Sequence, residues 1–201
     1  NKKLYLRSEW YSDHGHDHNP KVSRALEGRT ILGFNYRMNE LQGALGLAQL
    51  RKLDYIIAEQ KKNKAVIKDA LAQIPGVGFR TLPDPEGDSA TFLAFNLPEE
   101  KQALKFQKLL SQGGFDTTCY KSNLWHYVPN WEHFLAFSTA NSKKYPFKDK
   151  GYKGKVKYSR KSIPFAEDML GRTLVAGIAV RMSPERLDAI CKAIEKAAVG
   201  L

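Results

Sequence analysis

Apolar residues recur at three- and four-residue steps between residues 39 and 72, which is the spacing of an amphipathic helix. Asn39 at the start of this stretch is a typical N-cap, and Gln42 completes a capping-box pattern three residues later. No proline interrupts the stretch before Pro75. The pattern therefore predicts one long helix or two abutting helices over residues 39–72.

The rest of the chain alternates between shorter helical and extended patterns. Helices are predicted at residues 1–12 (a turn or two), 99–112, just after 166–168 and from 183 onward; strands at 77–82, 91–97, 115–120 and 174–182; and irregular structure at 14–33 and 121–165. Ser183-Pro184 is a typical helix start, Gly113-Gly114 is a typical helix end, and Cys191 lies on the apolar stripe of the last helix. Helices and strands mix, with several strands joined through helices, so the fold class is α/β or α+β.

The composition is that of a chain with a hydrophobic core. Of the 201 residues, 42% are hydrophobic and 11% are aromatic, which excludes global disorder. The longest apolar run, Leu174–Val180, is far shorter than the roughly 20 residues of a membrane span. Two cysteines, Cys119 and Cys191, are too few for a disulfide framework and lack metal-ligand spacing. We therefore expect a cytoplasmic protein with no membrane partner.

The net charge of +11 comes mainly from one segment. Residues 143–161 contain nine basic residues and one acidic residue, or +8, which leaves +3 for the other 182 residues. A high isoelectric point is typical of nucleic-acid-binding proteins, but a nearly balanced chain with one basic segment is not. We expect a solvated loop here. The alternatives are a loop that binds a polyanion or a phosphorylated sugar, and a nucleic-acid-binding module that also uses Trp125 or Trp131.

Three histidines alternate in the segment Asp13-His14-Gly15-His16-Asp17-His18. On an extended chain they would face one side, and neutral imidazoles bind zinc or copper. Gly15 and Asn19-Pro20 make the backbone irregular, however, and no later cysteine or carboxylate cluster completes a site. We therefore expect a solvated or dimer-contacting loop and no metal.

The segment Gly33–Met38 directly precedes the capped helix. It brings an amide (Asn35), a phenol (Tyr36) and a guanidinium (Arg37) close to a helix N-terminus, and such groups bind phosphate or carboxylate. The alternative is that Tyr36 and Met38 pack into the fold while Arg37 forms a salt bridge. The residues alone favour neither interpretation.

Aromatic residues and histidines gather in two neighbouring segments, Trp125-His126-Tyr127 and Trp131-Glu132-His133-Phe134. Stacking platforms for sugars or bases have this composition. Ordinary transitions from surface to core have it too, and we take such a transition as the default for these segments.

The stretch Gly33–Gln42 (GFNYRMNELQ), which continues through Ala44–Leu50, closely resembles the DegT/DnrJ/EryC1/StrS family of sugar aminotransferases. Upstream, Asp13-His14-Gly15 is similar to a DHG sequence of that family. Residues 77–120 resemble the strand, helix and strand of its small domain, and residues 164–185 resemble its closing pattern. The resemblance covers most of the chain and implies a pyridoxal-phosphate (PLP) enzyme of fold type I.

Family members are considerably longer, and this chain resembles their C-terminal half. The resemblance implies that the Schiff-base lysine belongs to an N-terminal half that this sequence lacks. We therefore expect no catalytic residue here, the missing half as a partner, and a homodimer. Residues 1–60 are expected to be the remainder of the large cofactor domain with a dimer-contact loop and helix. Residues 61–201 are expected to be the small domain, with a basic substrate-side loop at 121–165.

The resemblance also assigns roles to individual residues. Asn35 matches an asparagine that reaches across the dimer to the cofactor phosphate of the neighbouring subunit. Arg37 matches an arginine near the active site that would hold a carboxylate of glutamate or of the substrate. His126 corresponds to a histidine at the substrate mouth, although Trp125-His126 replaces the usual proline-leucine-histidine. The predicted substrate-binding residues are therefore Tyr36, Arg37 and His126.

The function implied by the resemblance is transfer of an amino group from glutamate to a keto or aldehydo sugar, for bacterial surface polysaccharide such as lipopolysaccharide. Asp13–His16 and the basic segment are similar to the branch that makes 8-amino-3,8-dideoxy-manno-octulosonate. Some relatives are instead dehydratases that use the aminated cofactor (PMP), with histidine in place of the lysine. That position is not in this sequence, so both activities stay open.

Overall fold

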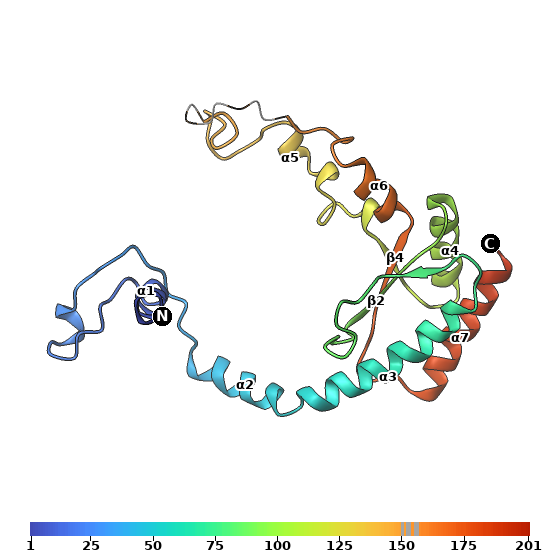
Figure 1. Ribbon diagram of the computed structural model, residues 1–201, viewed down its shortest axis with the longest axis horizontal. Coiled ribbons are helices and arrows are strands. Elements are labelled where there is room, and N and C mark those ends of the chain that lie inside the picture. Colours follow the sequence, from blue (N-terminus) through green and yellow to red (C-terminus); the bar gives the residue numbers. More distant parts are fainter. Residues whose placement is uncertain (150, 152–153, 155–156) are drawn as a thin grey trace. The chain divides into compact units, whose positions relative to one another are not determined.

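The computed structural model describes residues 1–149, 151, 154 and 157–201. The described residues divide into two compact units, Asn1–Leu53 (unit 1) and Asp54–Leu201 (unit 2), which we treat separately (Figure 1). The boundary predicted from the sequence lies at residue 60. Within these described ranges, no helix combines the length and the apolar character that crossing a membrane requires.

Unit 1 contains helix α1 (Lys2–Ser12), a 3-10 turn η1 (Arg24–Leu26) and helix α2 (Glu40–Leu50). Helix α1 is longer than the turn or two expected, and the side chain of Asn1 caps it by accepting the N–H of Leu4. Irregular chain joins the two helices, as the breakers in residues 14–33 predict.

The capping box at the start of α2 is confirmed. Asn39 Oδ1 accepts the N–H of Gln42 at 2.8 Å, and Gln42 Oε1 accepts the N–H of Asn39 at 3.0 Å. As far as the described residues go, α2 buries none of its side chains, and its exposed apolar residues are Leu41, Leu45, Leu47 and Leu50. The helix is therefore fixed at its start and uncovered along its length.

The stretch 39–72 forms two abutting helices, one of the two forms that its pattern predicts. Helix α2 ends because the N–H of Lys52 bonds to the carbonyl of Gln49, three residues back, at 2.9 Å, and this tighter turn interrupts the helical ladder. Helix α3 (Leu53–Ala72) then begins and runs into unit 2.

The described part of unit 2 contains a four-stranded antiparallel sheet in the order β1-β2-β4-β3. The strands are β1 (Gly78–Phe79), β2 (Phe92–Asn96), β3 (Thr118–Cys119) and β4 (Thr173–Gly177). In the central pair, Leu93 lies opposite Ala176 and Phe95 lies opposite Leu174. All four are buried, and since side chains alternate along a strand they share one face of the sheet. Strands β1 and β3 are shorter than predicted.

Helices α3, α4 (Glu100–Gln112) and α7 (Pro184–Val199) complete the hydrophobic core on that face (Figure 1). Phe106 of α4 is fully buried and meets Phe95 edge to face, with ring centroids 6.3 Å apart. Ile67 and Leu71 bring α3 into the same core. The core thus joins segments that are distant in sequence.

Helix α7 begins as its sequence predicts, because the Ser183 side chain accepts the N–H of Arg186. Its buried stripe differs from the predicted one. Ile190 and Ile194 are buried, but Cys191 is only half-buried, and the stripe runs instead through Ala193 and Ala197. The small alanines let α7 approach its neighbours closely on that side.

Strand β4 stops at Gly177, although its apolar pattern predicts a strand to residue 182. Two amide side chains of α3 donate hydrogen bonds to the backbone carbonyls that follow the strand. Gln60 Nε2 donates to the carbonyl of Ile178 at 2.7 Å, and Asn63 Nδ2 donates to the next two carbonyls at 3.0 and 3.2 Å. These bonds replace the strand partners and tie α3 to the chain that leaves the sheet.

The chain between β3 and β4 is largely irregular, as residues 121–165 predict. Its short elements are η2 (Tyr120–Ser122), η3 (Val128–Asn130), α5 (Glu132–Leu135) and α6 (Pro164–Gly171). The rings of Phe134, Phe137, Phe147 and Tyr158 cluster with centroids 5.4 to 5.9 Å apart. This aromatic cluster organises a segment that has little regular structure.

Candidate functional site

Asn35 and Arg37 lie at the surface just ahead of α2. Asn35 Oδ1 accepts the backbone N–H of Arg37 at 3.3 Å and its Nε–H at 3.2 Å. Within the described part of the chain, the Asn35 amide nitrogen and the two terminal guanidinium nitrogens of Arg37 have no hydrogen-bond partner. This donor pair therefore keeps several N–H groups for a ligand.

Asp13 holds the donor pair in place. Its backbone pairs with that of Asn35 in an isolated antiparallel bridge, and one oxygen of its carboxylate forms an ion pair with Arg37 Nε at 3.2 Å. The other oxygen lies 2.5 Å from Arg24 Nη2 and 3.3 Å from His18 Nε2. Asp13 is only 4% exposed, so it is a buried anion that orients the Arg37 guanidinium.

Two glycines allow the chain to fold this tightly. Gly15 has a φ of +81°, and a Cβ atom there would lie 1.9 Å from the carbonyl oxygen of Ile31. A Cβ atom at Gly33 would lie 2.4 Å from the backbone nitrogen of Gly15. A side chain at either position would displace the loop that carries the donor pair.

The Asp13 carboxylate makes the loop sensitive to acid. Its hydrogen bond from Arg24 lowers the pKa of Asp13, and the charges of Arg24, Arg37 and His18 act in the same direction against the effect of burial. Because the folded-state pKa is the lower one, the carboxylate stabilises the fold above the unfolded-chain value of about 3.9. This contribution is lost as the pH falls through the folded-state pKa.

We expect amide protection in the loop to fall as the pH drops below the unfolded-chain value of about 3.9 and through the lower folded-state pKa of Asp13. Hydrogen exchange of His14 and Tyr36 measures this, because their N–H groups bond to the carbonyls of Phe34 and Ser12 at 3.0 and 2.9 Å. In Asp13→Asn, protection is expected to be lower at neutral pH and nearly constant over the acid range. Wild-type protection that stays unchanged through this range would contradict the role given to Asp13.

The structure tests the packing interpretation of residues 33–38, whereas the anion-binding interpretation stays a prediction. Arg37 does form a salt bridge, but Tyr36 and Met38 do not pack into a core and are exposed. The Tyr36 ring stacks on the Phe34 ring with centroids 5.8 Å apart, and its centroid lies 5.9 Å from that of the Tyr11 ring. At the helix end, the capping box uses the N–H groups of Asn39 and Gln42, and the acidic Glu40 lies in the first turn.

The histidines of residues 13–18 do not converge on one point. His16 Nδ1 lies 2.8 Å from Glu27 Oε2, and His18 pairs with Asp13 instead. Among the residues that the structure describes, no group of three or more metal-binding side chains is placed to hold an ion. The segment is also not simply solvated, as Asp13 and His16 are buried. This ion-pair network is not predictable from the segment itself, because Arg24 and Glu27 lie outside it in the sequence.

His126 belongs to unit 2, so it is described apart from the donor pair of unit 1. It lines an open hollow of about 590 Å³ together with Trp125 and Trp131. The His126 ring meets the Tyr120 ring edge to face, with centroids 5.7 Å apart. The structure thus brings together the two aromatic segments that the sequence analysis singles out.

Two shielded lysines of unit 2 are held in ion pairs. Lys64 Nζ lies 2.5 Å from Asp88 Oδ2. Lys121 Nζ lies 2.6 Å from Glu100 Oε2 and 3.5 Å from Glu167 Oε1, and the hydrogen bond to Glu100 raises the pKa of Lys121. The Lys121 ammonium is thus held in its charged form and is not a nucleophile. We interpret both ion pairs as structural.

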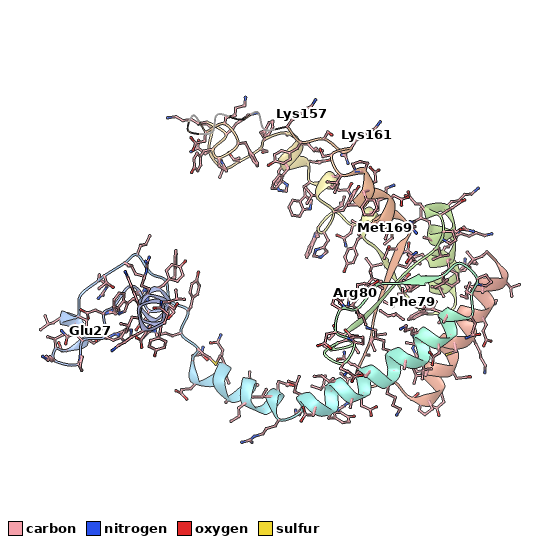
Figure 2. The ribbon with its side chains drawn as sticks, viewed as in Figure 1. Glu27, Phe79, Arg80, Lys157, Lys161 and Met169 are labelled. Carbon is pink, nitrogen blue, oxygen red and sulfur yellow. The ribbon has the colours of Figure 1, made fainter. Side chains whose placement is uncertain are left out.

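The basic segment 143–161 lies only partly within the described residues. Lys150, Lys153 and Lys155 are outside them. Arg160 Nη1 donates to the carbonyl of Pro129 at 3.3 Å, whereas Lys157 and Lys161 project outward and are exposed (Figure 2). The exposed lysines agree with the expected solvated loop and leave their charges accessible.

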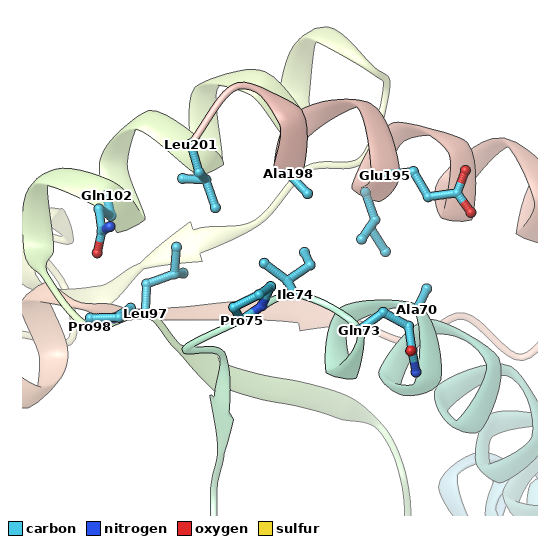
Figure 3. Close-up of a pocket in the computed structure, with 11 residues that line it drawn as sticks. Ala70, Gln73, Ile74, Pro75, Leu97, Pro98, Gln102, Glu195, Ala198 and Leu201 are labelled. Carbon is cyan, nitrogen blue, oxygen red and sulfur yellow. The ribbon is translucent and has the colours of Figure 1, made fainter.

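A second cavity, of about 450 Å³, lies between the ends of α3 and α7 and the start of α4 (Figure 3). Apolar side chains such as Ile74, Leu97 and Ile194 form most of its wall, and Gln102 and Glu195 add polar groups. None of the predicted site residues is among the described residues that line it.

The model of the DegT/DnrJ/EryC1/StrS aminotransferase family matches residues 1–147 of the chain.

Solved structures give the fold. TlmJ, an aminotransferase from Streptoalloteichus hindustanus, has 17% identity and a TM-score of 0.65, and the match covers 100% of this chain and 46% of that one. Spr1654 from Streptococcus pneumoniae, in its PLP form, has 11% identity and a TM-score of 0.70, and the match covers 99% of this chain and 44% of that one. The sugar aminotransferase CalS13 from Micromonospora echinospora has 16% identity and a TM-score of 0.64, and the match covers 97% of this chain and 45% of that one.

These matches confirm the mixed fold class and its relation to part of a fold-type-I aminotransferase. The chain spans less than half the length of each of these proteins.

Proposed function

The chain belongs to the DegT/DnrJ/EryC1/StrS aminotransferase family, and we propose that it is part of a PLP-dependent sugar aminotransferase. In this proposal, residues 1–60 complete the large cofactor domain and residues 61–201 form the small domain. The Schiff-base lysine comes from an N-terminal half, which is the partner of this chain in a cytoplasmic homodimer. The family match over residues 1–147 is the observation that carries the proposal.

The donor pair supports a cofactor role for unit 1. The amide of Asn35 has free N–H groups that suit a phosphate oxygen, and the guanidinium of Arg37 suits a carboxylate or phosphate. We assign Asn35 to the PLP phosphate of the neighbouring subunit and Arg37, oriented by Asp13, to a carboxylate of glutamate or of the substrate. When bound, PLP supplies the electron sink that transamination requires.

Tyr36 and His126 are assigned to the sugar substrate. The phenol of Tyr36 is exposed beside the donor pair, and His126 lines the hollow of unit 2. Both side chains donate and accept hydrogen bonds, as sugar hydroxyls require.

We extend the proposal to an acidic acceptor, a 3-deoxyoctulosonate that is aminated at C8 for lipopolysaccharide or a related surface polysaccharide. The basic segment 143–161 supports an anionic substrate, since its described lysines, including Lys157 and Lys161, are exposed (Figure 2). Amination of neutral sugars alone, with no activity on the acid, would restrict the proposal to the family activity.

The cofactor role of Asn35 is tested in the assembled enzyme. Asn35→Ala is expected to weaken PLP retention about tenfold or more, because a hydrogen bond to a charged group contributes about 1.5–3 kcal/mol. Equilibrium dialysis with absorbance of the retained cofactor measures the loss. Asn19→Ala is the matched control, since the Asn19 side chain accepts only the N–H of Lys21 and is given no ligand. Equal retention in both variants would contradict the assignment of Asn35.

The reaction itself is tested by the products formed with glutamate. Release of an amino sugar with consumption of glutamate supports transamination. Release of a keto-deoxy sugar without net transfer of the amino group supports the PMP-dependent dehydratase instead.

A further inference from the structure

Trp125 exposes a large aromatic face on a rigid backbone. Its side chain is 81% exposed, whereas tryptophan is on average highly buried. Its backbone is nevertheless held on both sides: the N–H donates to Asn123 Oδ1 at 2.7 Å, and the carbonyl accepts the Nε1–H of Trp131 at 3.0 Å. The backbone that carries the ring is therefore held while the ring itself faces solvent, and exposing so much apolar surface is unfavourable without a ligand.

The support for this backbone extends into the rest of unit 2. Asn130 Nδ2 donates to the carbonyls of Lys121 and Asn123 at 2.9 and 3.3 Å. Lys121 in turn forms ion pairs with Glu100 of α4 and Glu167 of α6. The aromatic hollow is thus connected to two helices and is organised before any ligand binds.

The hollow pairs aromatic surface with hydrogen-bonding groups. His133 stacks on Trp131 with ring centroids 5.7 Å apart and an interplanar angle of 20°, so one face of Trp131 is covered while Trp125 stays open. Across the described part of the chain, the side chains of His126, His133 and Glu132 have no hydrogen-bond partner. They are free to bond to hydroxyl groups.

The charge of the hollow argues against a polyanion. Its described lining residues include one carboxylate, Glu132, and neither lysine nor arginine. Sites that stack nucleobases normally add cationic side chains along the phosphate backbone. A pyranose ring has an apolar C–H face and a rim of neutral hydroxyls, which matches an open indole beside two imidazoles and a carboxylate.

We infer that this hollow binds the pyranose ring of the acceptor sugar, with its C–H face on Trp125 and its hydroxyls bonded to His126, His133 and Glu132. The inference rests on the proposed function and gives Trp125 a direct role in sugar specificity. It also makes the second aromatic segment part of a binding site rather than a transition to the core.

The test is binding of methyl pyranosides to the full chain, followed by tryptophan fluorescence and by saturation-transfer NMR. Trp10→Phe is the background variant for these measurements. Trp10 lies outside the hollow, so its replacement removes the tryptophan fluorescence of unit 1 and leaves Trp125 and Trp131 as the reporters. We expect saturable quenching at millimolar pyranoside in Trp10→Phe. Trp125→Ala is expected to weaken binding about fivefold to tenfold, and Trp125→Phe is expected to restore part of it. Trp125 is exposed, so its replacement leaves the fold intact.

The inference would be overturned by the absence of saturable pyranoside binding, or by binding of uridine in preference to pyranosides. Equal pyranoside affinity in wild type and Trp125→Ala would also overturn it. These outcomes are distinct from failure of the proposed function. An enzyme that retains PLP but binds no pyranoside contradicts only this inference, whereas a chain that binds pyranoside but never retains PLP when assembled contradicts only the proposed function.

Discussion

Phe106→Ala is expected to lower the free energy of unfolding of unit 2 by about 3–5 kcal/mol. Phe106 is fully buried between α4 and the sheet and lies edge to face with Phe95. Alanine would leave a cavity that the rigid sheet cannot close, so the lost burial adds to the cost of the void. Urea unfolding followed by far-UV circular dichroism measures the change in the transition midpoint.

The matched control lies on the same helix. Leu104 of α4 is 41% exposed, and Leu104→Ala is expected to change the free energy of unfolding by less than about 1 kcal/mol. Alanine is a better helix former than either residue, and it gains more propensity over phenylalanine than over leucine, so helix propensity does not explain a larger loss in Phe106→Ala. Equal effects would mean that the core is not packed around Phe106.

Gly15→Ala is expected to disrupt the loop that carries Asn35 and Arg37. The left-handed backbone at Gly15 costs a non-glycine residue about 1–3 kcal/mol, and the new Cβ would also meet the Ile31 carbonyl at 1.9 Å. The bridge between Asp13 and Asn35 cannot survive the shift that relieves this contact. Hydrogen exchange of the Tyr36 amide reports the loss directly.

Gly46→Ala provides the opposite case in the same unit. Apart from its chain neighbours and the backbone of its own helix, no described atom lies within 4 Å of a Cβ placed at Gly46, which lies inside α2. Alanine is expected to stabilise α2 by up to about 1 kcal/mol and to leave the protection of Tyr36 unchanged. Protection that survives Gly15→Ala would mean that the loop relaxes without releasing the donor pair.

The helices are the part of the fold that the sequence predicts best, because their signals are local. Asn39 with Gln42, and Ser183 with Pro184, mark helix starts within three residues and do so correctly. The strand ends are not local. The end of β4 depends on Gln60, whose partner carbonyl is 118 residues away, and no window of sequence contains that contact.

The candidate site divides in the same way. Asn35 and Arg37 are neighbours in sequence, so their pairing follows from the segment itself. The role of Asp13 does not follow from its own segment, because it depends on ion pairs of Arg24 and Arg37 with the same buried carboxylate. The exposure of Trp125 is equally hidden, as an aromatic-rich segment has the same composition whether it packs inside or faces solvent.

Helix α2 has one more consequence for how the protein matures. An isolated helix shorter than about 12–15 residues is marginal in water, and α2 has 11 residues, leucine side chains open to solvent and only its cap to hold it. Its helicity must then be gained when another surface covers those leucines. A chain made without such a surface is expected to expose this marginal helix to chaperones and proteases.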